Sequence, residues 1–257
     1  MISIDRLSVR YGSRQVLSDL SLGPLQGGTL TALVGPNAAG KSTLLRAIAG
    51  VVRAEGRVDL DGNNLLAMSF RERAKRIAFM PQALPTGIEL SVLEGVLHAL
   101  RASPTLVATD VDPVRRAYAV LDRLGLGDIA LQSMDRLSGG QRQMASLAQA
   151  LVRSPRLLLL DEPTSALDLR HQIDVMSAVR DFADHGAVVV AVLHDLALAA
   201  QWAGHVVVMS KGRIHSTGSP REVVTPGMLR DVYGVKARIE QCSRGMLQLA
   251  IDGPTIV

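Results

Sequence analysis

The sequence predicts an α/β fold with a mostly parallel sheet and helices on both of its faces. Strand-like apolar runs alternate with helical segments along most of the 257 residues, which favours parallel strands joined by helices. Hydrophobic residues make up 47% of the chain, enough for a sizeable core. Between about residues 83 and 136 the pattern becomes helical, and this predicts a helical lobe inserted into that core.

Hydrophobic periodicity places the elements of this fold along the chain. Alternating side chains indicate a half-buried strand, continuous apolar runs indicate buried strands, and apolar residues at three-to-four spacing indicate helices. The predicted elements are, in order, a strand at 2–10, a strand at 28–35, a helix at 41–49, strands at 56–62 and 76–82, helices at 93–100 and 113–124, a helix at 140–153, a strand at 156–161, a helix at 169–184, and strands at 187–194 and 205–212. The tail, 219–257, reads as one short helix followed by a hairpin.

Composition narrows the classes of function. Aromatic residues are only 3% of the chain, so recognition of single-stranded nucleic acid by base stacking is poorly supported. The formal charge of +4 suits an ordinary surface, and it equally suits attraction to an anionic membrane or to nucleic acid. The single cysteine, Cys242, excludes an internal disulfide and a cysteine metal cluster, and it fits a reducing compartment.

Neither a secretory signal nor a membrane span is expected. The opening "MISIDRLSVRYG" alternates apolar and polar residues and contains no apolar block. The longest apolar stretch, residues 186–204, is interrupted by His194 and Asp195 and is too short to cross a bilayer. We therefore expect a protein that is soluble or peripheral to a membrane.

A phosphate-binding loop is the strongest local signal. "GPNAAGKST" (35–43) matches G-x-x-x-x-G-K-[ST] between a predicted strand and a predicted helix, which is the context that the motif requires. Backbone N–H groups of residues 37–42 can surround a phosphate, and Lys41 adds a positive charge. The Ser42 hydroxyl can ligate Mg²⁺, and the helix dipole favours the anion.

Polar side chains end three of the predicted strands. Asp161 and Glu162 follow "LLLL", Gln82 ends the strand at 76–82, and His194 ends the strand at 187–194. In open α/β sheets ligands bind at the carboxyl ends of the strands, so these side chains are expected near the phosphates. Asp161 would hold Mg²⁺, and Glu162 could accept a proton from an attacking water. Each of these residues on its own would more often be structural.

A second glycine turn, "LSGGQ" (137–141), stands before a predicted helix but has no lysine. Taken in order, all of these residues resemble the ATP-binding subunit of ABC transporters over nearly the whole chain. The resemblance implies one domain, 1–257, with a P-loop NTPase core, an antiparallel β subdomain and an inserted α-helical subdomain. Its core would be about 1–82 and 140–216, its helical subdomain 83–139 and its C-terminal extension 217–257.

The resemblance also assigns roles to residues. Tyr11 would stack on adenine, and the phosphates would be held by Gly35, Pro36, Asn37, Ala38, Ala39, Gly40, Lys41, Ser42 and Thr43. The catalytic group would be Glu162, His194, Gln82 and Lys41, with Mg²⁺ on Ser42, Gln82 and Asp161. Ala38 departs from the glycine common in the family, and a positive φ there would add strain. From a second copy, Ser138, Gly139, Gly140, Gln141 and Asp168 would complete the site.

The partners and cargo are implied by the same resemblance. The chain would form a homodimer and bind two transmembrane permease subunits, which would dock near residues 83–105. A periplasmic or lipoprotein substrate-binding protein would complete the complex, and no nucleic acid is expected as a partner. The chain would be bound peripherally to the cytoplasmic face of the inner membrane. "LSVLEGVLHALR" (90–101), "LDLRHQIDVM" (167–176), "VLHDLALAAQWAGHVVVMSKGRI" (192–214) and "VVTPGMLRDVYGVKARIE" (223–240) are similar to importers of iron–siderophore, haem and cobalamin. Iron–siderophore is the first choice and haem the second.

Two rival classes remain open. A soluble ABC ATPase of DNA repair or translation usually carries a long coiled-coil insert or two tandem cassettes, and neither is found in this chain. A nucleotide-binding regulator without turnover is disfavoured by the presence of both Glu162 and His194.

Overall fold

The main sheet has six strands in the order β10-β9-β3-β8-β7-β6 in a computed structural model that describes residues 1–82, 89–102, 112–165 and 167–255. All neighbouring strands are parallel except the edge strand β10, which is antiparallel to β9. The strands span Arg213–Gly218 (β10), His205–Ser210 (β9), Thr29–Val34 (β3), Val188–Val192 (β8), Leu157–Asp161 (β7) and Ile77–Met80 (β6). The predicted mostly parallel sheet is therefore confirmed.

A second, antiparallel sheet has the strand order β2-β1-β4-β5. Its strands are Ile2–Tyr11 (β1), Arg14–Leu25 (β2), Glu55–Leu60 (β4) and Asn63–Asn64 (β5). Sequence periodicity missed β2 because its register with β1 shifts repeatedly, so its side chains do not alternate strictly. It also missed β10, where intermediate and exposed residues alternate without an apolar face.

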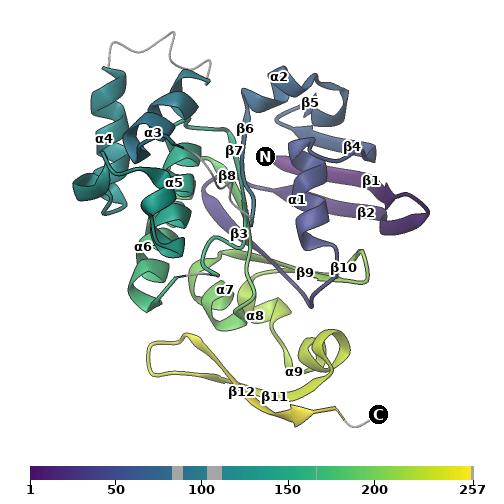
Figure 1. The fold of residues 1–257 in the computed structure, drawn as a ribbon. Helices are drawn as coiled ribbons and strands as arrows, with labels where there is room; N and C mark the ends of the chain where they lie inside the picture. The colour runs from purple at the N-terminus through teal and green to yellow at the C-terminus, as the bar shows by residue number, and fades with distance from the viewer. Residues whose placement is uncertain (83–88, 103–111, 166, 256–257) are drawn as a thin grey trace.

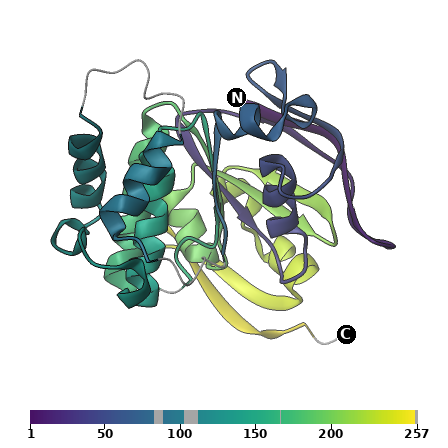
Figure 2. The same cartoon turned by 45° about the horizontal axis from the view of Figure 1, so that its top comes forward.

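Helices cover both faces of the main sheet (Figure 1). On one side lie α3 to α6, and on the other lies α1 with the antiparallel sheet beside it, an arrangement that the turned view also shows (Figure 2). The longer helices span Lys41–Ala49 (α1), Val92–Arg101 (α3), Pro113–Arg123 (α4), Gly139–Leu151 (α5), Leu169–Asp184 (α6) and Leu196–Trp202 (α7), and a short α2 spans Phe70–Ala74. The division of the chain into core, helical and C-terminal parts stays a prediction.

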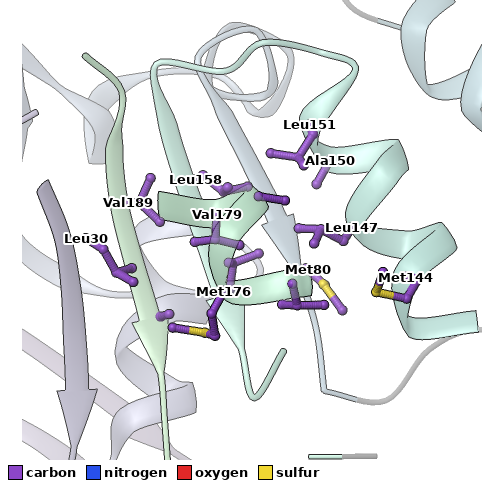
Figure 3. Packing of buried hydrophobic residues seen from close by; sticks show 14 of the residues in the cluster. Leu30, Met80, Met144, Leu147, Ala150, Leu151, Leu158, Met176, Val179 and Val189 are labelled. Atoms are coloured by element: carbon purple, nitrogen blue, oxygen red, sulfur yellow. The ribbon is translucent and has the colours of Figure 1, made fainter. Parts of the chain in front are cut away.

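The strands of the main sheet are apolar throughout because both of their faces are buried. In β7, Leu158 and Leu160 belong to the core under α5 and α6, whereas Leu157 and Leu159 belong to the core under α1. Figure 3 shows the first of these cores, with Met144 and Leu147 of α5 and Met176 of α6 directed at the sheet. This packing fixes α5 against the strand ends that carry the candidate site.

The tail differs in part from its prediction. The hairpin is present as β11 (Val235–Gln241) and β12 (Leu247–Pro254), but the single short helix is wrong. Three short segments replace it, namely α8 (Pro220–Val223), α9 (Pro226–Met228) and a π-helical turn at Leu229–Tyr233. Proline lacks an N–H and fits only the first turn of a helix, so Pro226 starts a new helix instead of extending α8.

No helix among the described residues combines the length and the apolar character that crossing a bilayer would need.

Candidate functional site

The phosphate loop connects β3 to α1 and leaves the start of α1 open to an anion. The N-cap of α1 is Gly40, with φ 100°, and no side chain caps the helix. The first backbone N–H groups of α1 therefore remain available to a ligand, at the positive end of the helix dipole. Gly35 is required for close packing, since a Cβ there would lie 2.2 Å from the carbonyl oxygen of Met209.

Ala38 lies in the left-handed region, with φ 62°. The structure thus places a strained alanine at the one position where the loop departs from the family pattern. The neighbouring Ala39 is not among the residues with positive φ, and its side chain is buried, at 2% exposure. The two alanines of "NAAG" therefore face different physical demands.

Lys41 is almost buried, at 6% exposure, and its ammonium is held within the loop. Its Nζ donates to the carbonyl oxygens of Gly35 at 2.6 Å and Pro36 at 3.0 Å. Burial lowers the pKa of Lys41, and the nearby charges of Glu162 and Asp161 oppose that shift. A phosphate beside Lys41 would supply a negative charge that stabilises the buried ammonium in its charged form.

Ser42 and Asp161 meet on the far side of the loop. Ser42 Oγ donates to Asp161 Oδ1 at 2.8 Å. Asp161 is fully buried, which raises its pKa, and its buried Oδ2 has no hydrogen-bond partner among the residues that the structure describes. An orphaned carboxylate oxygen beside a hydroxyl is a hard donor pair of the kind that Mg²⁺ takes from a protein when phosphates and waters supply its other ligands. The residues present therefore fit Mg²⁺.

Glu162 receives two side chains from other strand ends. Gln82 Nε2 donates to Glu162 Oε2 at 2.6 Å, and His194 Nε2 lies 2.5 Å from Glu162 Oε1. The Glu162 side chain is only 11% exposed, and its backbone has φ 58°. The three strand ends that the sequence singled out thus converge on one carboxylate.

These groups border a cavity of about 900 Å³. The described residues that line it and were expected are Tyr11, Asn37, Ala38, Ala39, Gly40, Lys41, Ser42, Thr43, Gln82, Glu162 and His194. Arg14 and Val16 also line it, and sequence reasoning missed both. The signal was the turn "GS" (12–13), one residue after the strand predicted at 2–10, because a hairpin there returns β2 toward Tyr11.

Eight expected residues are not among the described residues that line this cavity: Gly35 and Pro36 of the phosphate loop, Asp161 at the end of β7, and the group expected to serve a second copy, Ser138, Gly139, Gly140, Gln141 and Asp168. Ser138 caps α5, where its Oγ accepts from the Gln141 N–H at 3.2 Å and Gln141 Oε1 accepts from the Ser138 N–H at 3.0 Å. Asp168 caps α6 by accepting from the His171 N–H at 2.9 Å. Their expected role toward a second copy stays a prediction.

Two more contacts reach the site from segments that the sequence did not connect with it. Gln143 of α5 donates from Nε2 to the main-chain oxygen of Glu162 at 2.7 Å. Tyr233, in the C-terminal segment, is hydrogen-bonded by the backbone of Gly35, and its burial raises the pKa of its hydroxyl to about 12. Both residues are far along the chain from their partners, so local patterns carry no signal for either contact.

Comparison with known proteins agrees with this geometry. The family model described as "ABC transporter" matches residues 17–165. Over 246 residues the chain is 40% identical to a hemin import ATP-binding protein, HmuV, of Pseudomonas entomophila, with 93% of this chain and 95% of that protein covered. It is 38% identical to a cobalamin import ATP-binding protein, BtuD, of Halobacterium salinarum, covering 93% of this chain and 60% of that protein.

A solved structure of a metal-chelate type ABC transporter in an inward-facing conformation superposes with a TM-score of 0.79. It is 27% identical, with 97% of this chain and 96% of that chain covered. The matching order of the phosphate loop, the carboxylates and the strand ends, together with the extent of these matches, leads to one conclusion. This chain belongs to the ABC transporter family, as one of its ATP-binding and ATP-hydrolysing subunits.

Proposed function

We propose that the chain is the ATP-hydrolysing motor of a complex that imports a metal chelate, and that two copies enclose ATP between them. The observation that carries the catalytic part is the convergence of Gln82 and His194 on Glu162, beside the phosphate loop. A largely buried carboxylate that two polar side chains contact is held in one orientation, as a group that receives a proton must be.

Within one copy, the residues divide into those that bind ATP and those that act on it. Tyr11 stacks on adenine, the backbone N–H groups of residues 37–42 surround the phosphates, and Lys41 neutralises their charge. Ser42, Gln82 and Asp161 would hold Mg²⁺. The bound ion would neutralise charge that develops on the transferred phosphate.

Glu162 accepts the proton of the attacking water, and His194 orients the γ-phosphate and that water from the neighbouring strand. In the described structure both of these side chains border the cavity, and their mutual distance is 2.5 Å. Their contact must open for a water and a phosphate to enter between them.

Each copy completes the pocket of the other. Ser138, Gly139, Gly140 and Gln141 stand at an uncharged helix start, where hydroxyl and N–H donors can meet a γ-phosphate whose cation comes from the partner's Lys41. Because these residues and Asp168 lie outside their own cavity lining, a two-fold pairing would give them a ligand. Hydrolysis then removes the phosphate that bridges the two copies, and the copies part.

The complex is proposed to sit on the cytoplasmic face of the inner membrane, with two permease subunits and a periplasmic or lipoprotein binding protein. The candidate permease contact is 83–105, of which 83–88 and 103–105 lie outside the described residues. In α3 the apolar stripe of Val92, Val96 and Leu100 is internal core. The exposed side of that helix, with Glu94 and His98, is what remains for a partner.

For the cargo, iron–siderophore is the first candidate and haem the second. The second is favoured by relatives at about 40% identity that are named hemin import proteins. Cobalamin follows, on the relatives named for it. The cargo does not touch this chain, so the site itself cannot rank the three.

A gene deletion tests the proposal. The deletion strain is grown with ferric siderophores, haem or cobalamin as the limiting source, and it is complemented with the wild-type or the Glu162→Gln chain. We expect a defect on one source, restored by the wild type and not by the variant. No defect on any source, combined with nucleic-acid-stimulated ATPase activity of the purified chain, would favour the soluble class instead.

A further inference from the structure

Gln143 is a buried polar side chain that the site roles above leave unused. It lies on α5 with 6% of its surface exposed. Its Nε2 donates to the main-chain oxygen of Glu162 at 2.7 Å, across 19 residues of sequence. A buried side-chain amide that donates a hydrogen bond to one backbone carbonyl fixes the position of that carbonyl relative to the helix.

The carbonyl belongs to a residue whose backbone needs such support. Glu162 has φ 58°, in the left-handed region that non-glycine residues rarely adopt. The same carbonyl also accepts from the Ser165 hydroxyl at 3.2 Å, within the loop that follows β7. Gln143 therefore attaches this strained turn to a separate, packed helix, and the direction in which the Glu162 side chain leaves the backbone depends on that attachment.

The start of α5 is the segment proposed to meet the partner's ATP. Ser138 and Gln141 lock the first turn reciprocally through their side chains. Gln143 lies five residues after Ser138, about 7.5 Å along the helix axis. Because Ser138 and Gln143 both lie on the rigid first turns of α5, a displacement of Ser138 moves the Gln143 amide with it.

We propose that Gln143 is a positioning residue that transmits the state of one ATP pocket to the general base of the other. Nucleotide held by the partner copy fixes the start of α5, and Gln143 then holds the Glu162 backbone in its catalytic orientation. This inference rests on the proposed function, because it requires the two-copy site. Gln143 touches neither nucleotide, so it acts on turnover and not on binding.

The test is Gln143→Met, which keeps the length of the side chain and removes its donor. The matched control is Gln149→Met on the same helix, where the amide contacts Met134 Sδ at 3.5 Å and does not reach Glu162. We expect Gln143→Met to lower kcat between about 10- and 100-fold, as a misplaced catalytic group does, and to leave KM for ATP within about threefold. Gln149→Met should leave both kcat and KM near the wild-type values.

A double-mutant cycle separates transmission from local damage. If Gln143 transmits the position of Ser138, the effects of Ser138→Ala and Gln143→Met on kcat are less than multiplicative, whereas those of Ser138→Ala and Gln149→Met multiply. Multiplicative effects in the first pair, or an unchanged kcat in Gln143→Met, would overturn the inference.

Dimer formation keeps this result distinct from a failure of the proposed function. Glu162→Gln and Glu162→Gln/Gln143→Met should both form an ATP-dependent dimer at similar ATP concentrations. Absence of a dimer in Glu162→Gln alone would contradict the proposed two-copy site. A dimer that forms in Glu162→Gln and is lost in the double variant would contradict the statement that Gln143 acts on turnover and not on binding.

Discussion

Two adjacent alanines in the phosphate loop should respond to the same substitution with opposite signs. Ala38 has φ 62°, where an L-residue pays about 1–2 kcal/mol relative to its usual conformations. Replacement by glycine removes that strain but adds about 0.4–1 kcal/mol of conformational freedom to the unfolded chain. The difference predicts that Ala38→Gly raises the free energy of unfolding by about 0.5–1 kcal/mol.

Ala39 supplies the matched control. Its side chain is 2% exposed and its φ is not positive, so replacement by glycine relieves no backbone strain. The substitution removes a buried methyl group, at about 0.8 kcal/mol, and adds the same unfolded-state entropy. Ala39→Gly should therefore lower the free energy of unfolding by about 1–2 kcal/mol.

Urea unfolding measures both changes, with the slope against denaturant expected to stay constant. Affinity for ATP, measured with a fluorescent analogue, should change less than about threefold in Ala38→Gly. The reason is that glycine keeps the backbone N–H of position 38, so the donors that surround the phosphate are the same in both chains. If Ala38→Gly destabilises the chain as Ala39→Gly does, the reasoning from φ is refuted; a tenfold gain in affinity would instead mean that strain arises on binding.

Three further substitutions test other parts of the account. A hydrogen bond with Arg156 is the main reason that the pKa of Asp61 is lowered from 3.8 to about 2, so Asp61 stabilises the fold above pH 4 and loses that contribution as the pH falls toward 2. Asp61→Asn should therefore lower the free energy of unfolding in urea by about 1–2 kcal/mol at pH 7, after allowance for solvent exposure, and by progressively less in acid. A loss that does not depend on pH would contradict this assignment. Asp161→Asn should weaken ATP binding when Mg²⁺ is present, yet bind at least as tightly as wild type in EDTA because a charge that repels phosphate is gone; an unchanged Mg²⁺ dependence in titrations would exclude Asp161 as a ligand. Ser138→Arg should still bind ATP but lose turnover in a phosphate-release assay, since its own pocket is intact, and normal turnover would rule out the shared pocket.

Sequence patterns were sufficient to predict those elements whose structure is determined by residues close together in the chain. The apolar runs of β7 and β8 predicted buried parallel strands, and the polar residues that end them predicted where Asp161, Glu162 and His194 would gather. The phosphate loop followed from glycine spacing and its context. In each case the signal lies within a few residues of the feature.

What could not be predicted depends on distant parts of the chain or on backbone geometry. The left-handed turn at Glu162 and its tether to Gln143 require α5 to be packed on the sheet. Arg14 and Val16 reach the cavity only because a strand with shifted register folds back on β1. The contact of Tyr233 with Gly35 depends on tertiary packing of the C-terminal segment.

The pairing of two copies around ATP is tested most directly by light scattering of the Glu162→Gln chain with and without ATP and Mg²⁺. The account predicts a single-chain species near 27.4 kDa without nucleotide and about twice that mass with ATP, while ADP leaves the mass unchanged. A wild-type preparation that hydrolyses ATP at full rate while remaining strictly single-chain would contradict it.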